Sequence, residues 1–292
     1  MTKRRAQVTA LLSSFCYFHG MSEANWAEHA RMSAAQRWER ASAEMGRHVT
    51  DALVEYANPQ PGERVLDVAC GTGAPSLKVA RRVGASGGVV AADLSEEPLK
   101  IAAERARERA LTNITFERAD VHALQYPENS FDLITCRFGA MFFSDLPRAL
   151  REMRRVLKPG GRVAFAAWGS FDQPYFQATV QIVMRHTGAK VPPGTAAMFK
   201  FAEKGTLARA LSEAGFADAR DEIRTVPWVW TESAAELWAY FQAVTAPFRP
   251  VIESAKDKPE IEREVTAALE KFVDGGAVKL TAQIVLAGGR KT

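Results

Sequence analysis

The sequence predicts an α/β protein with a mostly parallel sheet and helices on both of its faces. Short apolar runs rich in β-formers alternate with stretches of helical periodicity from residue 64 onward, which is the rhythm of βαβ units. The first run ends in a glycine turn that leads directly into a helix. Three runs close on an acidic residue, at the edge where open α/β sheets bind ligands. With 292 residues, 47% of them hydrophobic, the chain can bury a large core.

The first strand and its glycine turn form the centre of the predicted site. Arg64–Ala69 is an apolar run between Pro61-Gly62 and the glycines Gly71 and Gly73, so we expect a buried strand that ends in a tight turn. Pro75 suits the first turn of the helix that follows, because its missing N–H would have no partner there. Glycines before a helix N-terminus let the backbone approach a ligand and donate N–H groups to it. This turn is a candidate nucleotide site.

An acid within the first strand indicates which kind of nucleotide would bind. A dinucleotide-binding G-x-G-x-x-G motif places a pyrophosphate at the turn, but Ser76 occupies the third glycine position and Asp67 lies four residues before Gly71. A carboxylate there would repel a phosphate and would stabilise a nearby cation. The pattern therefore favours a nucleoside that carries an ammonium and a sulfonium group.

These residues resemble the first motif, D/E-x-G-x-G-x-G, of the class I S-adenosylmethionine (SAM)-dependent methyltransferases. Ala69 takes the place of the first glycine, which is the one departure from the motif. The resemblance implies a Rossmann-like sheet of seven strands with helices on both faces. It implies SAM as the cofactor and S-adenosylhomocysteine as the product. The implied cofactor-binding residues of this motif are Asp67, Ala69, Gly71, Thr72 and Gly73.

The second strand, Gly88–Asp93, also ends in an acid, which lies 20 residues past Gly73. Doubly wound folds place at this spacing the carboxylate that accepts hydrogen bonds from the ribose hydroxyls. The alternative is a purely structural acid that caps the next helix, but Ser95 is expected to serve as that cap. We therefore assign Asp93 to the ribose and include Leu94 in the cofactor site.

The third strand is expected over Ile114–Asp120. The methyltransferase resemblance implies that Asp120 accepts a hydrogen bond from the adenine amino group and that the backbone N–H of Val121 contacts a ring nitrogen. His122 could act as a base, but the sequence indicates no partner for it, and a histidine in a surface loop is an equal alternative.

The fourth strand, Ser130–Cys136, leads into an apolar loop that contains a glycine. The resemblance places the residues just after this strand near the methionine portion and the transferred methyl group. Arg137 and Phe138 are therefore candidate cofactor residues, and Met141 and Phe142 are candidate walls of the substrate pocket. Two alternatives stay open for Arg137, which could instead anchor the substrate or pair with a structural acid.

A turn before the fifth strand narrows the resemblance. The segment Leu157-Lys-Pro-Gly-Gly-Arg162 precedes a hydrophobic strand and resembles the ubiquinone/menaquinone-biosynthesis-type methyltransferases, which act on small molecules. Along the chain we expect five segments. They are a poorly ordered extension at 1–21, an N-terminal helical cap at 22–58, the SAM-binding core at 59–169, an inserted irregular lid at 170–203, and the C-terminal part of the sheet with extra helices at 204–292. Met1 and Met21 are both possible natural starts. Trp38, in the cap, is either a pocket wall or a core aromatic residue.

Composition argues against several other classes of protein. The net charge of +4 and the pI near 9.0 would permit nucleic-acid binding, but the basic residues are not gathered, and the densest group, Arg148 to Lys158, fits the solvated face of a helix. Three separated cysteines indicate neither a disulfide framework nor a zinc site, and no other metal site is expected. They suit a reducing cytoplasm. No run reaches the roughly 18 apolar residues of a membrane span.

The expected reaction is in-line transfer of a methyl group to a small, apolar or aromatic molecule through oxygen, carbon or nitrogen. Because a sulfonium is an activated leaving group, the protein has mainly to align the reactants and exclude water, and no catalytic residue is predicted. The alternatives are a SAM-binding regulator or non-methylating enzyme on the same scaffold, an RNA methyltransferase and, third, a nicotinamide oxidoreductase. The sequence leaves the acceptor and the oligomeric state open.

Overall fold

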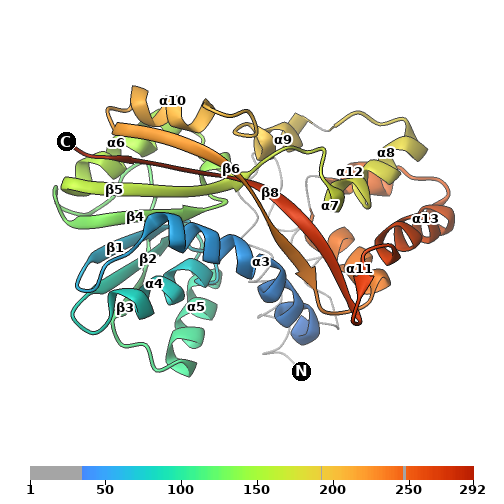
Figure 1. Ribbon diagram of the computed structural model, residues 1–292, viewed down its shortest axis with the longest axis horizontal. Coiled ribbons are helices and arrows are strands. Elements are labelled where there is room, and N and C mark those ends of the chain that lie inside the picture. The colour runs from blue at the N-terminus through green and yellow to red at the C-terminus, as the bar shows by residue number, and fades with distance from the viewer. Residues whose placement is uncertain (1–34, 192, 246–247) are drawn as a thin grey trace.

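A single mixed sheet organises the protein (Figure 1), whose computed structural model describes residues 35–191, 193–245 and 248–292. The strands are ordered β3-β2-β1-β4-β5-β8-β6, with the short β7 paired to β8. Strands β1 to β5 run parallel, whereas β8 is antiparallel to both of its neighbours. The strands are β1 Arg64–Val68, β2 Gly88–Asp93, β3 Ile114–Arg118, β4 Phe131–Arg137, β5 Leu157–Trp168, β6 Ala217–Trp230, β7 Val273–Asp274 and β8 Ala277–Arg290.

Helices cover both faces of this sheet. One face carries α3, α4 and α5, and the other carries α6 and α10 (Figure 1). Their bounds are α3 Ala35–Ala57, α4 Ala74–Val83, α5 Glu96–Glu108, α6 Leu146–Val156 and α10 Thr206–Glu213. Because both faces are covered, the central strands are buried almost throughout: every residue of β1 after Arg64 is buried. The predicted α/β fold with helices on both faces of the sheet is confirmed.

Two long strands extend the sheet beyond the Rossmann-like part. In Figure 1, β6 and β8 run past the ends of β4 and β1, and most of the remaining helices gather around this extension. These are α7 Pro174–Gln177, α8 Val180–Thr187, α9 Pro193–Ala196, α11 Ala234–Val244, α12 Arg249–Glu253 and α13 Lys258–Glu270, with 3-10 turns η1 Ala140–Phe142 and η2 Ala197–Phe199. The prediction that residues 170–203 are irregular was wrong, because short helices occupy most of this segment.

Strand register brings the predicted ligand-binding ends to one edge. Val68 of β1 lies opposite Ala92 of β2, and Asp93 of β2 lies opposite Arg118 of β3. The carboxyl ends of these three parallel strands are therefore level, and the loops that follow them are neighbours. Within the described ranges, every helix is too short or too polar to span a bilayer.

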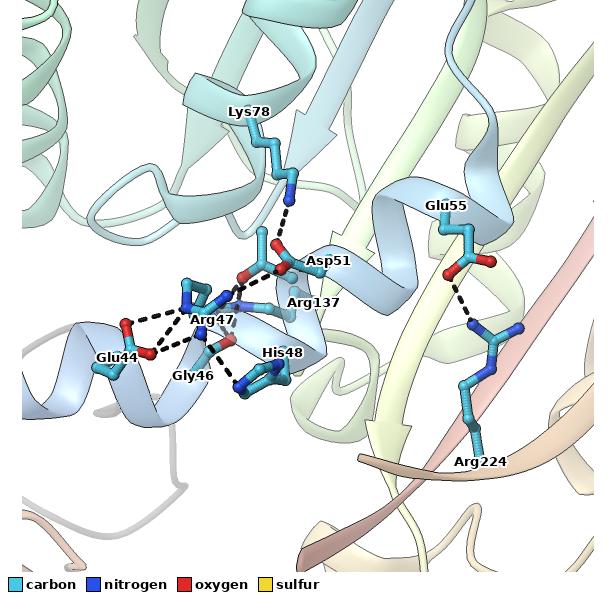
Figure 2. A network of polar contacts seen from close by, with 10 residues as sticks. Glu44, Gly46, Arg47, His48, Asp51, Glu55, Lys78, Arg137 and Arg224 are labelled. Carbon is cyan, nitrogen blue, oxygen red and sulfur yellow. Dashed lines mark hydrogen bonds and ion pairs between the residues drawn. The ribbon is translucent and has the colours of Figure 1, made fainter. Parts of the chain in front are cut away.

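Helix α3 crosses the sheet and is fixed at several points along its length. Its apolar face buries Val49 and Leu53 completely against the sheet. Polar contacts hold its sides (Figure 2): Asp51 pairs with Lys78 of α4, and Glu55 pairs with Arg224 of β6 at 3.2 Å. Residues 22–34 of the predicted cap lie outside the described part, so the predicted segment limits stay untested.

We expect Leu53→Ala to lower the free energy of unfolding by about 2–5 kcal/mol, because the substitution leaves a cavity between α3 and the sheet. Glu55→Ala is the matched control on the same helix, and it should change stability by less than about 1 kcal/mol since its ion pair is exposed. Urea denaturation measures both values. Equal losses for the two variants would contradict the packing described for α3.

Candidate active site

The glycine turn after β1 has the backbone geometry that the motif requires. Ala69, Gly71 and Gly73 all have positive φ, at 52°, 54° and 83°. A Cβ atom on Gly73 would lie 2.9 Å from that of Ala102 on α5, so both backbone conformation and space require glycine there. Ala69 adopts the same left-handed conformation with a side chain, which costs about 1–2 kcal/mol. Alanine at position 69 therefore preserves the backbone shape of the motif and adds local strain.

Asp67 lies beneath this turn and is fully enclosed, with 0% of its surface exposed. Its carboxylate accepts hydrogen bonds from Ser76 of α4 and, at 2.7 Å, from Thr135 Oγ1 of β4. Burial raises its pKa to about 6, and the two hydroxyl donors oppose that rise. Asp67 therefore joins three elements and can act on a ligand through its charge, and its part in the cofactor site stays a prediction.

Asp93 closes β2 and is already engaged with the backbone on both sides. Its Oδ2 accepts the N–H of Gly71 at 2.8 Å, and its Oδ1 accepts the N–H of Ser95 at 3.0 Å. Ser95 occupies the N-cap of α5, but its hydroxyl makes no capping bond, so the sequence-based reason for excluding a structural acid was wrong. A carboxylate has about four lone-pair positions; two remain for ribose hydroxyls, a role that stays a prediction.

The residues next to these acids hold the turns in place. The carbonyl of Thr72 accepts a hydrogen bond from Arg105 of α5 at 3.2 Å, and the carbonyl of Leu94 accepts one from Arg118 at 3.1 Å. The side chains of Thr72 and Leu94 are half-buried. The two carbonyls are therefore used within the protein, as are the N–H groups of Gly71, which donates to Asp93, and of Gly73, which donates to the carbonyl of Cys70.

Asp120 differs from its predicted position, because β3 ends at Arg118 and Asp120 lies exposed in the following turn. Its Oδ1 is 2.7 Å from Nδ1 of His122 and 2.9 Å from the backbone N of the same residue. Asp145 N–H donates to His122 Nε2 at 3.3 Å, so the imidazole carries its proton on Nδ1 and donates it to Asp120. His122 therefore has the partner that the sequence did not indicate. Val121 beside them is buried.

Arg137 ends β4 and reaches toward α3, as Figure 2 shows. Its Nη1 donates to the carbonyl of Gly46 at 3.2 Å and to Thr50 Oγ1 at 2.8 Å. Burial lowers its pKa, and the nearby Asp67 opposes that shift. Two alternatives were left open for Arg137, to anchor the substrate or to pair with a structural acid. Among the described residues, Arg137 forms no ion pair with an acid.

Phe138 has a strained backbone next to this position. Its φ of 60° is an outlier for a bulky residue, and such strain concentrates at functional sites. Its ring stacks on Trp168 of β5 with centroids 4.7 Å apart and planes 16° apart. The half-buried Phe138 thus presents an aromatic wall at the strand ends where a ligand would bind.

The three predicted pocket residues have different outcomes. Met141 is a core residue with 2% of its surface exposed, and its Sδ accepts the backbone N–H of Trp168 at 3.4 Å. The prediction that it lines a pocket was wrong, because the 3-10 turn points it inward. Phe142 is half-buried, which leaves its role a prediction. The side chain of Trp38 lies outside the described residues.

An aromatic cluster extends from this wall, and most of it was missed in the sequence. Trp168 contacts Trp228 of β6 and Phe176 of α7 with ring centroids 5.1 and 5.4 Å apart, and Tyr175 lies 5.6 Å from Trp228. Strand β6 continues to Trp230. The alternation of Val226, Trp228 and Trp230 was the available signal, since alternate residues of a strand share a face.

Comparison with known proteins gives consistent results. Residues 41–227 match the ubiE/COQ5 methyltransferase family. Nocamycin O-methyltransferase from Saccharothrix syringae is 28% identical over 277 residues, which are 87% of this chain and 94% of that protein. Ubiquinone/menaquinone biosynthesis C-methyltransferase UbiE from Bdellovibrio bacteriovorus is 36% identical over 173 residues, which are 58% of this chain and 72% of that protein.

Two solved structures show the same fold. The YcgJ protein from Bacillus subtilis superposes with a TM-score of 0.55 and 21% identity over 83% of this chain and 97% of its own. The (4+2)-cyclase SpnF superposes with a TM-score of 0.52 and 23% identity over 98% of this chain and 94% of its own. Likenesses at this level of identity show the fold alone.

We expect Asp93→Asn to weaken SAM binding by about 10- to 100-fold, because the neutral amide forms weaker hydrogen bonds with the ribose hydroxyls than a carboxylate does. The amide oxygen of the variant can accept only one of the N–H groups of Gly71 and Ser95, so a thermal melt of Asp93→Asn must accompany the affinity and show that the fold persists. Glu97→Gln, at an exposed acid four residues along the chain in the first turn of α5, is the control. Isothermal titration calorimetry gives the affinities, and an unchanged value would remove Asp93 from the site.

We also expect SAM affinity to rise with pH between about 5 and 7. The pKa of Asp67 is about 6 in the free protein, and a bound cation stabilises the ionised carboxylate and lowers that pKa. Binding near pH 6 should therefore release a proton, which calorimetry in buffers of different ionisation enthalpy detects.

Asp67→Asn is the test of this assignment, because the amide does not titrate. Asp93 also has a pKa raised by burial, so Asp93→Asn measured in the same way separates the two contributions. Proton release that persists in full in Asp67→Asn would show that another group is responsible.

Proposed function

We propose that this chain, which belongs to the ubiE/COQ5 methyltransferase family, methylates a small aromatic molecule that packs against Phe138. The protein is a SAM-dependent small-molecule methyltransferase. The observation that supports the acceptor class is the strained Phe138, stacked on Trp168 directly after β4. Nocamycin O-methyltransferase and UbiE differ in the atom that their names assign, so the accepting atom is left to experiment.

The residues around the glycine turn fit the cofactor. The absence of side chains at Gly71 and Gly73 would allow a ligand to approach the turn closely, the remaining lone pairs of Asp93 suit two vicinal hydroxyls, and Asp67 supplies negative charge below the turn. When bound, SAM supplies a methyl group on a positively charged sulfur, which is an activated leaving group.

The chain's own contribution is positioning and exclusion of water. Phe138 is half-buried and is backed by the buried cluster around Trp168, so its ring offers a flat apolar surface against which an aromatic acceptor can be aligned; such alignment lowers the barrier of an in-line displacement. His122 already donates its Nδ1 proton to Asp120 and accepts at Nε2 from Asp145. We therefore assign no general base, and the nucleophile belongs to the substrate.

The arginines of α6 offer little support for an RNA substrate. Arg148 donates to the carbonyl of His122, Arg154 to that of Gly215, and Arg155 to that of Leu124. The expectation of a merely solvated face was therefore wrong for these residues, because they tie α6 to neighbouring loops. Arginines engaged in this way have fewer donors for a phosphate backbone. A reducing cytoplasm remains the proposed compartment, since Cys70 and Cys136 are buried free thiols.

Transfer of an isotopically labelled methyl group from SAM to a panel of phenols, quinols and polyketides tests the function. Labelled product from an aromatic acceptor supports the proposal. The same scaffold occurs in the (4+2)-cyclase SpnF, so conversion of a substrate without gain of label would support a non-methylating enzyme instead.

We expect Phe138→Leu to raise the KM for the aromatic acceptor by about 3- to 10-fold, because an aromatic contact contributes about 0.5–1.5 kcal/mol beyond buried area. The affinity for SAM should change by less than about 2-fold. Phe272→Leu, a half-buried phenylalanine just after α13, is the control. Steady-state kinetics measures both parameters, and a KM unaffected in Phe138→Leu would exclude this wall from acceptor binding.

A further inference from the structure

Arg137 and Asp67 lie side by side on the α3 face of the sheet. Asp67 of β1 is opposite Thr135 of β4, and the Thr135 hydroxyl donates to it. Arg137 is two residues beyond Thr135 on the same strand, so its side chain leaves the sheet on the same face. A carboxylate and a guanidinium therefore lie close enough to interact electrostatically at the edge that carries the glycine turn.

Only part of the guanidinium is used within the described chain. Nη1 makes both of its hydrogen bonds, to the carbonyl of Gly46 and to Thr50 Oγ1. A Cβ atom on Gly46 would lie 3.0 Å from Nη1, so a side chain at this position would crowd the guanidinium. Nε and Nη2 have no acceptor among the described residues, and neither is sealed in the core. The Nε and Nη2 donors, which lie along one edge of the guanidinium, thus remain for a ligand.

The charge of this pair matches the amino-acid end of the cofactor. An α-amino acid carries an ammonium and a carboxylate on one carbon, and a neighbouring acid and arginine complement both groups. A guanidinium binds a carboxylate through two parallel N–H···O bonds. A desolvated guanidinium without a counter-ion is also costly, and both oxygens of Asp67 are already occupied by hydroxyls.

We propose that Arg137 binds the carboxylate of the cofactor's amino-acid portion and, through Gly46 and Thr50, couples that binding to the seating of α3. The inference rests on the proposed SAM-dependent function and deepens it. One guanidinium would contact the ligand through Nε and Nη2 and the helix through Nη1. The carboxylate of the ligand would therefore order Arg137 and, with it, the middle of α3 around Gly46 and Thr50.

Two nucleosides that differ in the amino-acid portion test the first half of the proposal. S-Adenosylhomocysteine carries the carboxylate, whereas 5′-methylthioadenosine lacks the amino-acid group. We expect Arg137→Met to weaken binding of S-adenosylhomocysteine by about 10- to 100-fold and binding of 5′-methylthioadenosine by less than 2-fold. Arg137→Lys should recover part of the loss. Equal effects on both nucleosides, or no effect on either, would overturn the assignment.

Arg47→Met is the matched control. Arg47 lies on α3 near Arg137 (Figure 2), but it is half-exposed and pairs with Glu44 and Asp51 at 2.7 and 3.6 Å. It should leave both affinities unchanged. Failure of the wild-type protein to bind either nucleoside would refute the SAM-dependent function itself, and the inference with it. If the wild-type protein binds both nucleosides and Arg137→Met binds them with unchanged affinity, only the inference about Arg137 is refuted.

Hydrogen–deuterium exchange tests the coupling to α3. S-Adenosylhomocysteine should slow exchange of the amides at residues 44–54 in the wild-type protein, and 5′-methylthioadenosine should not. Thr50→Val keeps the side-chain volume and removes the hydroxyl, so it should reduce this protection even if Arg137→Met fails to fold. Equal protection by the two nucleosides, or protection unchanged in Thr50→Val, would refute the coupling.

Discussion

The buried carboxylate of Asp67 is the interaction on which the geometry of the site depends. It accepts hydrogen bonds from Ser76 and Thr135 and thereby joins β1 to α4 and to β4. An ionised group without such partners could not be kept in the interior. Because the glycine turn lies between Asp67 and Ser76 in the chain, the same bonds fix both ends of that turn. The charge that favours a cationic nucleoside is thus also the connection that shapes the loop around it.

Asp93 and Arg137 extend this principle to neighbouring strands. Asp93 draws the backbone of the glycine turn toward β2, and Arg137 holds α3 against the end of β4. Each polar side chain at this edge performs a structural task with part of its hydrogen-bonding capacity. The remaining lone pairs and donors face the place where the cofactor is expected. Such partial use keeps a ligand-free site ordered, which reduces the entropy lost on binding.

The sequence was sufficient for the sheet and the turn, because these follow from local patterns. Apolar runs, glycines with positive φ and the spacing from Gly73 to Asp93 reflect the chain's own periodicity. The errors concern contacts between distant segments. Nothing near Met141 shows that it points into the core, and the Asp120–His122–Asp145 chain joins two loops. The aromatic cluster was missed for a similar reason, since it assembles from β5, α7 and β6.

The position of β8 has a consequence for synthesis of the protein in the cell. Residues 277–290 lie between β5 and β6 and supply the sheet pairing of β6 on that side. While the ribosome is still making the preceding residues, β5 has an unpaired edge and the 14-residue β6 has no neighbour. Exposed strand edges invite pairing with other chains. Both edges therefore stay open to such pairing until residues 277–290 emerge and join β5 to β6.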